Sequence, residues 1–237
     1  MKTTKPRLID YLMITPDAQT RIFDLQYQVE LYEIFHRTRL SRTLHTLCTP
    51  IITWSMFILA ARIPLRGPAL MAQFSMGTEI NAAFVLMGVL LLWYLKLDAL
   101  VALTAAPILV TMWITSNLFS AALGGTAGWY GLSLMFICST IQDVSHAVEP
   151  LPPPLSGNDH FGEGKAVLAR MPLKMRIYTL VGGITIFAVL ELISSPRIFV
   201  VQILSILKRF GYKKDFYEKA TATAHEVLRG NRLLSTL

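Results

Sequence analysis

The sequence predicts an all-α membrane protein, a polytopic helical bundle with about five (four to six) hydrophobic spans and an N-terminal amphipathic helix. Hydrophobic residues make up 53% of the 237 residues and charged residues only 16%, whereas soluble domains have about 25% charged residues. The hydrophobic residues gather in long blocks flanked by basic residues. The net charge of +7 therefore indicates topology signals and lipid-headgroup contacts, and no aromatic-basic module for nucleic acid is present.

The amphipathic helix is expected over residues 15–36, after a flexible N-terminus of residues 1–14. Thr15 can cap this helix, and Pro16 suits its first turn. Residues on one face recur at steps of three and four, and they are Ile22, Leu25, Val29, Tyr32 and His36. We expect the helix to lie on the membrane or on the bundle.

Five hydrophobic blocks follow, each near the lower limit of about 17–20 residues for a membrane span. They are residues 46–61, 80–95, 99–115, 126–145 and 177–193. Lys96 and Asp98 mark a tight break between the second and third blocks, and Gly124 and Gly125 predict a turn before the fourth.

The rest of the chain is more polar. A proline-rich loop covers 149–176, and the short apolar segment 198–210 is expected to be interfacial or half-inserted. Residues 213–229 predict a polar helix that Gly230 should end. We therefore divide the chain into a membrane helical domain, 15–210, and a polar C-terminal helix and tail, 211–237.

Basic residues before the first block predict a cytoplasmic start. Four crossings return the chain to the same side, where the loop 149–176 is also basic. A fifth full crossing would place the basic residues of 208–214 on the opposite side, so block 177–193 is either re-entrant or followed by a sixth pass through 198–210. The first span also serves as the targeting signal, which in a eukaryotic cell leads to the endoplasmic reticulum.

Three histidines are expected at one membrane face. His36 and His45 precede the first span and His146 closes the fourth, so an even number of crossings separates them. Three imidazoles at one surface could converge on a metal ion, and imidazole suits iron, copper or zinc alike. His36 and His45 would point in opposite directions on one straight helix, so convergence requires a bend, which we place near Ser41.

Polar residues within one turn of these histidines are candidates to orient them, because a metal-bound imidazole usually donates its second N–H to a neighbouring acceptor. These candidates are Tyr32 before His36, and Gln142, Asp143 and Glu149 around His146. His160 is expected to be solvent-exposed and His225 to be structural. Glu191 lies within an apolar block, where a carboxylate is costly and either pairs or serves a site.

The histidine spacing resembles that of a known family. Residues 32–50 read Tyr-Glu-Ile-Phe-His, eight residues, then His-Thr-Leu-Cys-Thr-Pro, which resembles the motif of the Mpo1-like family of membrane 2-hydroxy fatty acid dioxygenases. Residues 141–149 resemble that family's Gln-x-x-x-His stretch with its following Glu, and 187–191 resemble its last hydrophobic block. The similarity covers roughly residues 30–210. It departs at Ser41, where the family often has Asn, and at Cys48 and Ser145, where it has Gly.

The resemblance implies an Fe(II)-dependent dioxygenase of the endoplasmic reticulum membrane, with its metal site at the cytoplasmic face. The implied reaction is fatty-acid α-oxidation, in which a 2-hydroxy fatty acid and O₂ yield a chain one carbon shorter. The implied partners are a lipid or fatty-acid substrate, O₂ and the bilayer. The implied roles are iron binding by His36, His45 and His146, with His160 or Glu149 as a further ligand, and orientation by Tyr32 and Gln142.

Other functions stay open from the residues alone. One is a lipid- or terpenoid-tailoring membrane enzyme that uses carboxylates such as Asp143, Glu149 and Glu191 for acid catalysis. Another is a non-enzymatic membrane scaffold or lipid-binding protein, and a third is a bis-histidine haem protein. Cys48 and Cys138 are expected to pack as small apolar residues, and the sequence carries no signal for an oligomeric state.

Overall fold

The computed structural model describes residues 21–65, 79–149, 172 and 194–234. Within these residues the regular elements are helices and no strand occurs, so the all-α prediction is confirmed. Two helical stretches, Arg39–Ala61 and Ala99–Ser145, are long and apolar enough to cross a membrane, and Ala82–Leu97 is apolar but shorter. The predicted block 177–193 and the loop before it lie almost entirely outside the described residues.

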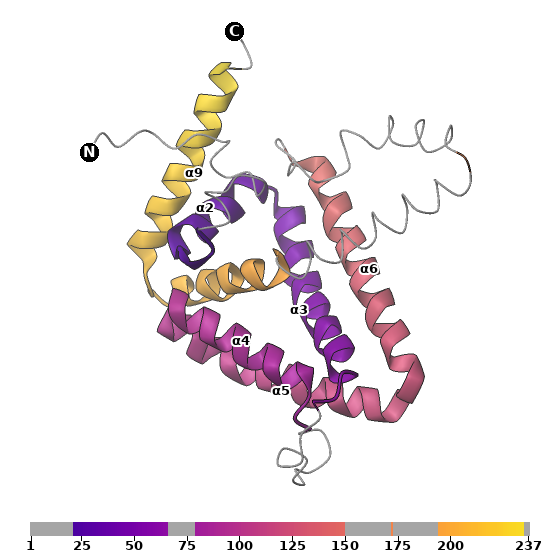
Figure 1. The fold of residues 1–237 in the computed structure, drawn as a ribbon. Coiled ribbons are helices and arrows are strands. Elements are labelled where there is room, and N and C mark those ends of the chain that lie inside the picture. The colour runs from indigo at the N-terminus through magenta and orange to yellow at the C-terminus, as the bar shows by residue number, and fades with distance from the viewer. Residues whose placement is uncertain (1–20, 66–78, 150–171, 173–193, 235–237) are drawn as a thin grey trace.

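An antiparallel helix pair stands at the centre of the fold. Helices α3 (Arg39–Ala61) and α6 (Ala127–Ser145) lie side by side and run in opposite directions (Figure 1). Gly131 permits a close approach, because a Cβ there would lie 3.2 Å from Ile58 Cγ2 of α3. The start of α3 therefore lies beside the end of α6, at one end of the pair.

Helices α4 (Ala82–Leu97) and α5 (Ala99–Leu123) pack on each other and on α3. Asp98 joins them: its N–H donates to Tyr94 O at the end of α4, and its carboxylate accepts from Val101 N–H at the start of α5. One residue thus satisfies backbone groups at both helix ends. The predicted break at this point is confirmed.

Helix α5 continues beyond the predicted end at residue 115 and runs to Leu123. The polar pair Ser116–Asn117 does not end the helix, because both residues are buried and Asn117 accepts a hydrogen bond from Asn81. A short 3-10 turn, η3 (Gly124–Thr126), then redirects the chain into α6. The predicted turn at the glycine pair is therefore present.

The predicted N-terminal helix is wrong in extent within the described residues, but its predicted apolar face packs on the bundle, which was one of its two expected positions. A 3-10 turn, η2 (Arg21–Phe23), comes first, and α2 (Leu25–Phe35) begins only after Asp24 caps it. Nearly every side chain of α2 is buried, including the polar Gln28 and Glu33. The helix is a core element because α9 and the helical residues 194–209 cover the side that would otherwise face water or lipid.

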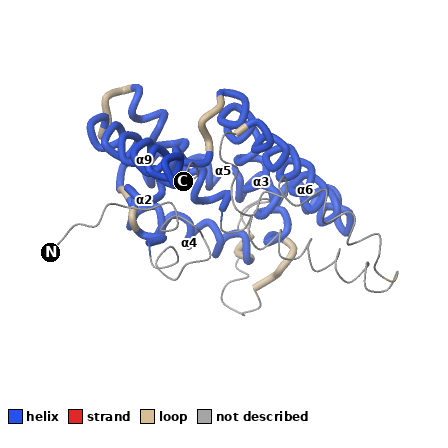
Figure 2. Tube along the Cα trace, turned by 90° about the horizontal axis from the view of Figure 1, so that it is seen from above, coloured by secondary structure: helices blue, strands red, loops and turns tan. Residues whose placement is uncertain are grey.

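The C-terminal helices complete the fold. Residues 194–209 are helical, and their apolar side chains join the core cluster that also contains α4 and α5 residues. Helix α9 (Lys214–Leu234) packs on α2, as Figure 2 shows from above. Gly230 does not end α9, contrary to the prediction, since an exposed helical glycine costs only about 1 kcal/mol.

We expect Asp98→Ala to lower the free energy of unfolding by about 1–3 kcal/mol, because it removes a helix cap and the acceptor for Tyr212 and Lys213. The control is Glu218→Ala on the exposed face of α9. This change breaks only a surface pair with Lys214 and should cost about 0.5 kcal/mol or less. Unfolding in mixed micelles, followed by circular dichroism, measures both. Equal stability of the two variants would contradict the role of Asp98.

Candidate metal centre

Three buried histidines meet at the end of the α3–α6 pair. The ring centroids of His36 and His45 lie 4.2 Å apart, and that of His146 lies 4.8 Å from each of them. One ligand nitrogen from each residue lies within 4.8 Å of the other two. All three side chains are buried, so the group is not an accidental surface cluster.

The local chain direction explains this convergence. Helix α2 ends at Phe35, His36 adopts a non-helical conformation, and Thr38 starts α3 as its N-cap. The bend that brings His36 towards His45 therefore lies at residues 36–38, and the predicted position near Ser41 is wrong because Ser41 is already within α3. His146 enters from the other side, as the residue that ends α6.

Each imidazole is held by a backbone group. His36 Nδ1 and His45 Nδ1 lie 3.0 Å from the carbonyl oxygens of Tyr32 and Ser41, and His146 bonds to the backbone of Phe35. A carbonyl only accepts, so these ring nitrogens carry the proton and the other nitrogen of each ring keeps a lone pair. This arrangement is typical of imidazoles that bind a metal.

The nitrogen that keeps its lone pair is unsatisfied in two of the three rings. His36 Nε2 and His146 Nδ1 are buried and have no hydrogen-bond partner. An unsatisfied buried polar atom costs about 1–3 kcal/mol, and each such atom in a native structure calls for an explanation. A shared ion would satisfy both, so the residues present fit a metal.

Burial also keeps the rings in the form that binds metals. It lowers the pKa of His36 well below its ordinary value, and the neighbouring His45 and His146 lower it further. Burial likewise lowers the pKa of His146, although the charge of Glu149 opposes the shift. These imidazoles are therefore neutral at pH 7, which is the state that coordinates a cation.

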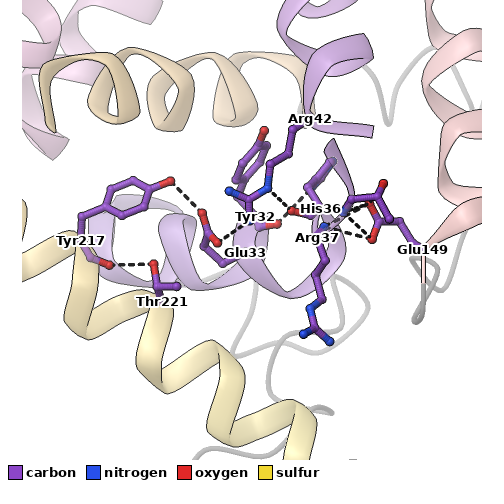
Figure 3. A network of polar contacts seen from close by, with 9 residues as sticks. Tyr32, Glu33, His36, Arg37, Arg42, Glu149, Tyr217 and Thr221 are labelled. Atoms are coloured by element: carbon purple, nitrogen blue, oxygen red, sulfur yellow. Dashed lines mark hydrogen bonds and ion pairs between the residues drawn. The ribbon is translucent and has the colours of Figure 1, made fainter. Parts of the chain in front are cut away.

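Glu149 binds the backbone of the bend at residues 36–38. Its carboxylate oxygens accept hydrogen bonds from the backbone N–H groups of Arg37 and Thr38 at 3.0–3.3 Å, and from Thr38 Oγ1 at 2.9 Å (Figure 3). The carboxylate also sits at the positive end of the α3 dipole. In the structure Glu149 therefore caps α3, and it is not part of the group of three converging ligands.

Tyr32 and Gln142 take different places around the centre. The Tyr32 ring stacks on His36, with centroids 4.4 Å apart and planes 12° apart. Burial raises the pKa of Tyr32 to about 12, so its phenol stays protonated. Gln142 donates to Thr49 Oγ1 at 2.9 Å, one turn beyond His45. Tyr32 thus contacts a ligand, whereas the hydrogen bond of Gln142 supports α3.

The remaining candidates do not join this group. His225 is exposed on α9, and Asp143 is half-buried on α6. His160 and Glu191 lie outside the described residues. The side chains at the three positions that depart from the family motif make contacts between α3 and α6. Ser145 Oγ lies 3.4 Å from Ser41 Oγ, and the free thiols of Cys48 and Cys138 are hydrogen-bonded.

A buried network that the sequence did not predict connects the bend to α9. Arg42 Nε donates to His36 O at 2.7 Å and Arg42 Nη2 donates to Glu33, which also accepts from the Tyr217 hydroxyl at 2.8 Å (Figure 3). Glu33 is almost fully buried, so its charge requires these partners. No sequence signal identifies this network, because Glu33 resembles a carboxylate on the solvent-exposed face of a helix.

No protein-family model matches the chain, and comparisons with curated proteins and with solved structures give no match either. The functional argument therefore depends on the centre itself. Three neutral imidazoles at this spacing could hold a transition metal ion, and ligand type alone is compatible with iron, zinc, copper or nickel.

We expect the purified protein to bind about one transition metal ion per chain. His36→Ala, His45→Ala and His146→Ala should each reduce bound metal to near zero, because each removes one of three ligand atoms. Inductively coupled plasma mass spectrometry measures the stoichiometry. His225→Ala removes an exposed histidine from α9 and should leave metal content unchanged. Full metal content in all three site variants would contradict metal binding by these histidines.

Arg42→Gln should lower the free energy of unfolding by about 1–3 kcal/mol, because it leaves Glu33 buried with only Tyr217 as a partner. Arg39→Gln is the matched control, since Arg39 is exposed at the start of the same helix and should change stability by about 0.5 kcal/mol or less. Thermal unfolding in detergent compares them. An Arg42 variant as stable as the control would show that the network is not stabilising.

Proposed function

We propose that the protein is an Fe(II)-dependent membrane dioxygenase that acts on 2-hydroxy fatty acids or a related lipid. The observation that carries the proposal is the meeting of three buried imidazoles, each of which is held through one ring nitrogen by a backbone carbonyl and keeps a lone pair on the other. The similarity of residues 32–50 and 141–149 to the Mpo1-like motifs supports iron and lipid oxidation over other uses of such a centre.

In this proposal His36, His45 and His146 hold the iron. An iron ion held there would supply Lewis-acid chemistry towards O₂ and the hydroxy-carboxylate head of the substrate. Tyr32 fixes the plane of the His36 ring by stacking on it. Glu149 holds the bend at 37–38 so that the rings of His36 and His146 stay in contact.

The surroundings of the centre suit an amphipathic substrate. Exposed apolar side chains lie close to the ligands in sequence, with Leu47 and Ile51 on α3 and Ile141 and Val144 on α6. An acyl chain would lie along these side chains while its polar head meets the histidines at the end of the helix pair. Both helical stretches that include these residues are long enough to cross a membrane.

The proposal includes the membrane setting. We infer a bundle of about five spans in the endoplasmic reticulum membrane, with the centre at the cytoplasmic face. The basic residues that precede the first apolar helix support this orientation. The centre lies near the start of α3, which places it at a membrane boundary if α3 crosses the bilayer.

The test is turnover of 2-hydroxypalmitate by protein reconstituted with Fe(II) in nanodiscs, measured as O₂ uptake and as formation of the chain one carbon shorter. His146→Ala should reduce the rate by at least about 100-fold, because a lost ligand costs more than the 10–100-fold typical of lost outer contacts. His225→Ala should keep the full rate.

Other outcomes select the alternatives. Turnover that survives a chelator but is lost in Glu149→Gln would favour acid catalysis, and a Soret band would favour haem. Zero metal and zero turnover in protein that is folded by circular dichroism would favour a scaffold. Each of these results contradicts the dioxygenase proposal.

A further inference from the structure

The opposite end of the α3–α6 pair has a second site. Because the helices are antiparallel, the end of α3 at Ala61 lies beside the start of α6 at Ala127. A pocket of about 300 Å³ opens there. Its lining is Leu59, Arg62, Gly125, Gly128, Trp129 and Leu132.

Arg62 provides the charge of this pocket and is held in place. Its Nη1 donates to Gly124 O at 2.6 Å, and its stem lies against Gly128, where a Cβ would come within 3.1 Å of Nε. Among the described residues no carboxylate forms an ion pair with Arg62, and no lining residue is acidic. The guanidinium therefore offers its other N–H groups to an anion.

Three helix ends meet at this pocket. The first turn of α6 contains no acidic residue, and its N-cap Thr126 makes no side-chain capping bond. Gly128 and Trp129 belong to this turn and line the pocket. Helices α3 and α5 end beside it with Arg62 and Gly124 as their C-caps, so their negative dipole ends offset the positive end of α6. The charge that the pocket offers to a phosphate group is therefore that of the Arg62 guanidinium.

The pocket lies at the level expected for lipid headgroups. Arg62 follows His45 by 17 residues, which is about 25 Å of α-helix, compared with a hydrocarbon core of about 30 Å. Trp129 is 73% exposed and Leu132 is 42% exposed. Tryptophan and arginine at the end of an apolar helix are typical of the membrane–water boundary.

We propose that this pocket binds the phosphate of a membrane phospholipid, with Arg62 as its counter-charge. The apolar side chains of Leu59, Trp129 and Leu132 contact the glycerol and the first part of the acyl chains. The site requires no metal and no turnover, so it does not depend on the proposed dioxygenase reaction, although it rests on the membrane setting of the proposed function. It would attach the α3–α6 pair to the leaflet opposite the metal centre.

Native mass spectrometry of the purified chain in detergent tests this site. The probes are 1-palmitoyl-2-oleoyl-phosphatidylglycerol, the diacylglycerol with the same chains, and inorganic phosphate. We expect the phospholipid to bind at least about 10-fold more tightly than the diacylglycerol, since only the former carries the phosphate that Arg62 contacts. Inorganic phosphate should bind more weakly than the lipid.

Two variants locate the site. Arg62→Gln removes the charge, and Gly125→Leu fills the pocket without a clash, because no atom lies within 4 Å of a Cβ there. Each should weaken phospholipid binding about 10-fold. Arg229→Gln, which removes an exposed arginine from α9, is the control and should leave binding unchanged.

Several results would overturn the proposal: equal binding of phospholipid and diacylglycerol, equal binding of inorganic phosphate and phospholipid, or unchanged binding in both pocket variants. A thermal unfolding midpoint for each variant confirms that the chain is folded. If Arg62→Gln fails to fold, Gly125→Leu alone decides the question, because it leaves the bond from Arg62 to Gly124 O in place.

Discussion

The hydrogen bonds from Arg37 and Thr38 to Glu149 connect the chain segments that bring the three histidines of the candidate metal centre together. A helix that begins at a sharp bend exposes backbone N–H groups that its own chain does not satisfy. Here the bend at 36–38 exposes such groups, and a carboxylate that arrives at the end of α6 accepts from them. The same contact therefore stabilises the start of α3 and joins the segment of His36 to that of His146.

Burial of three imidazoles at one point is costly, and this cost is itself an argument about function. Three imidazoles are buried with one nitrogen of each within 4.8 Å of the others, and two ring nitrogens have no hydrogen-bond partner. A core evolved for stability alone would place apolar residues here, since a partly satisfied polar group is worse than none. Such violations of local rules are expected at functional sites, where a bound ion offsets the cost.

The order of the apolar helices could be predicted from the sequence because it depends on local composition. Asp98 was identifiable as a break since a carboxylate beside Lys96 interrupts two apolar blocks. The convergence of His36, His45 and His146 was predicted from an even number of membrane crossings, but the structure needs only one antiparallel pair, α3 and α6, to produce it. The prediction thus relied on more spans than the geometry requires.

Long-range contacts explain what could not be predicted. Glu149 bonds to residues more than 100 positions away, and Glu33 to Tyr217 across a still longer separation. No spacing rule reports such partners. The burial of the polar side chains of α2 could not be predicted for the same reason: they resemble a solvent-exposed face until α9 and residues 194–209 are seen to cover them.

The two ends of the α3–α6 pair present one physical problem with two solutions. Each end includes the positive terminus of a helix whose first turn lacks an acidic residue. At the start of α3, Glu149 supplies the anion from within the chain. At the start of α6, no described carboxylate pairs with Arg62, and a pocket is open beside its guanidinium. A fold that neutralises one terminus internally and leaves the other open is consistent with an external anion as the partner of the second.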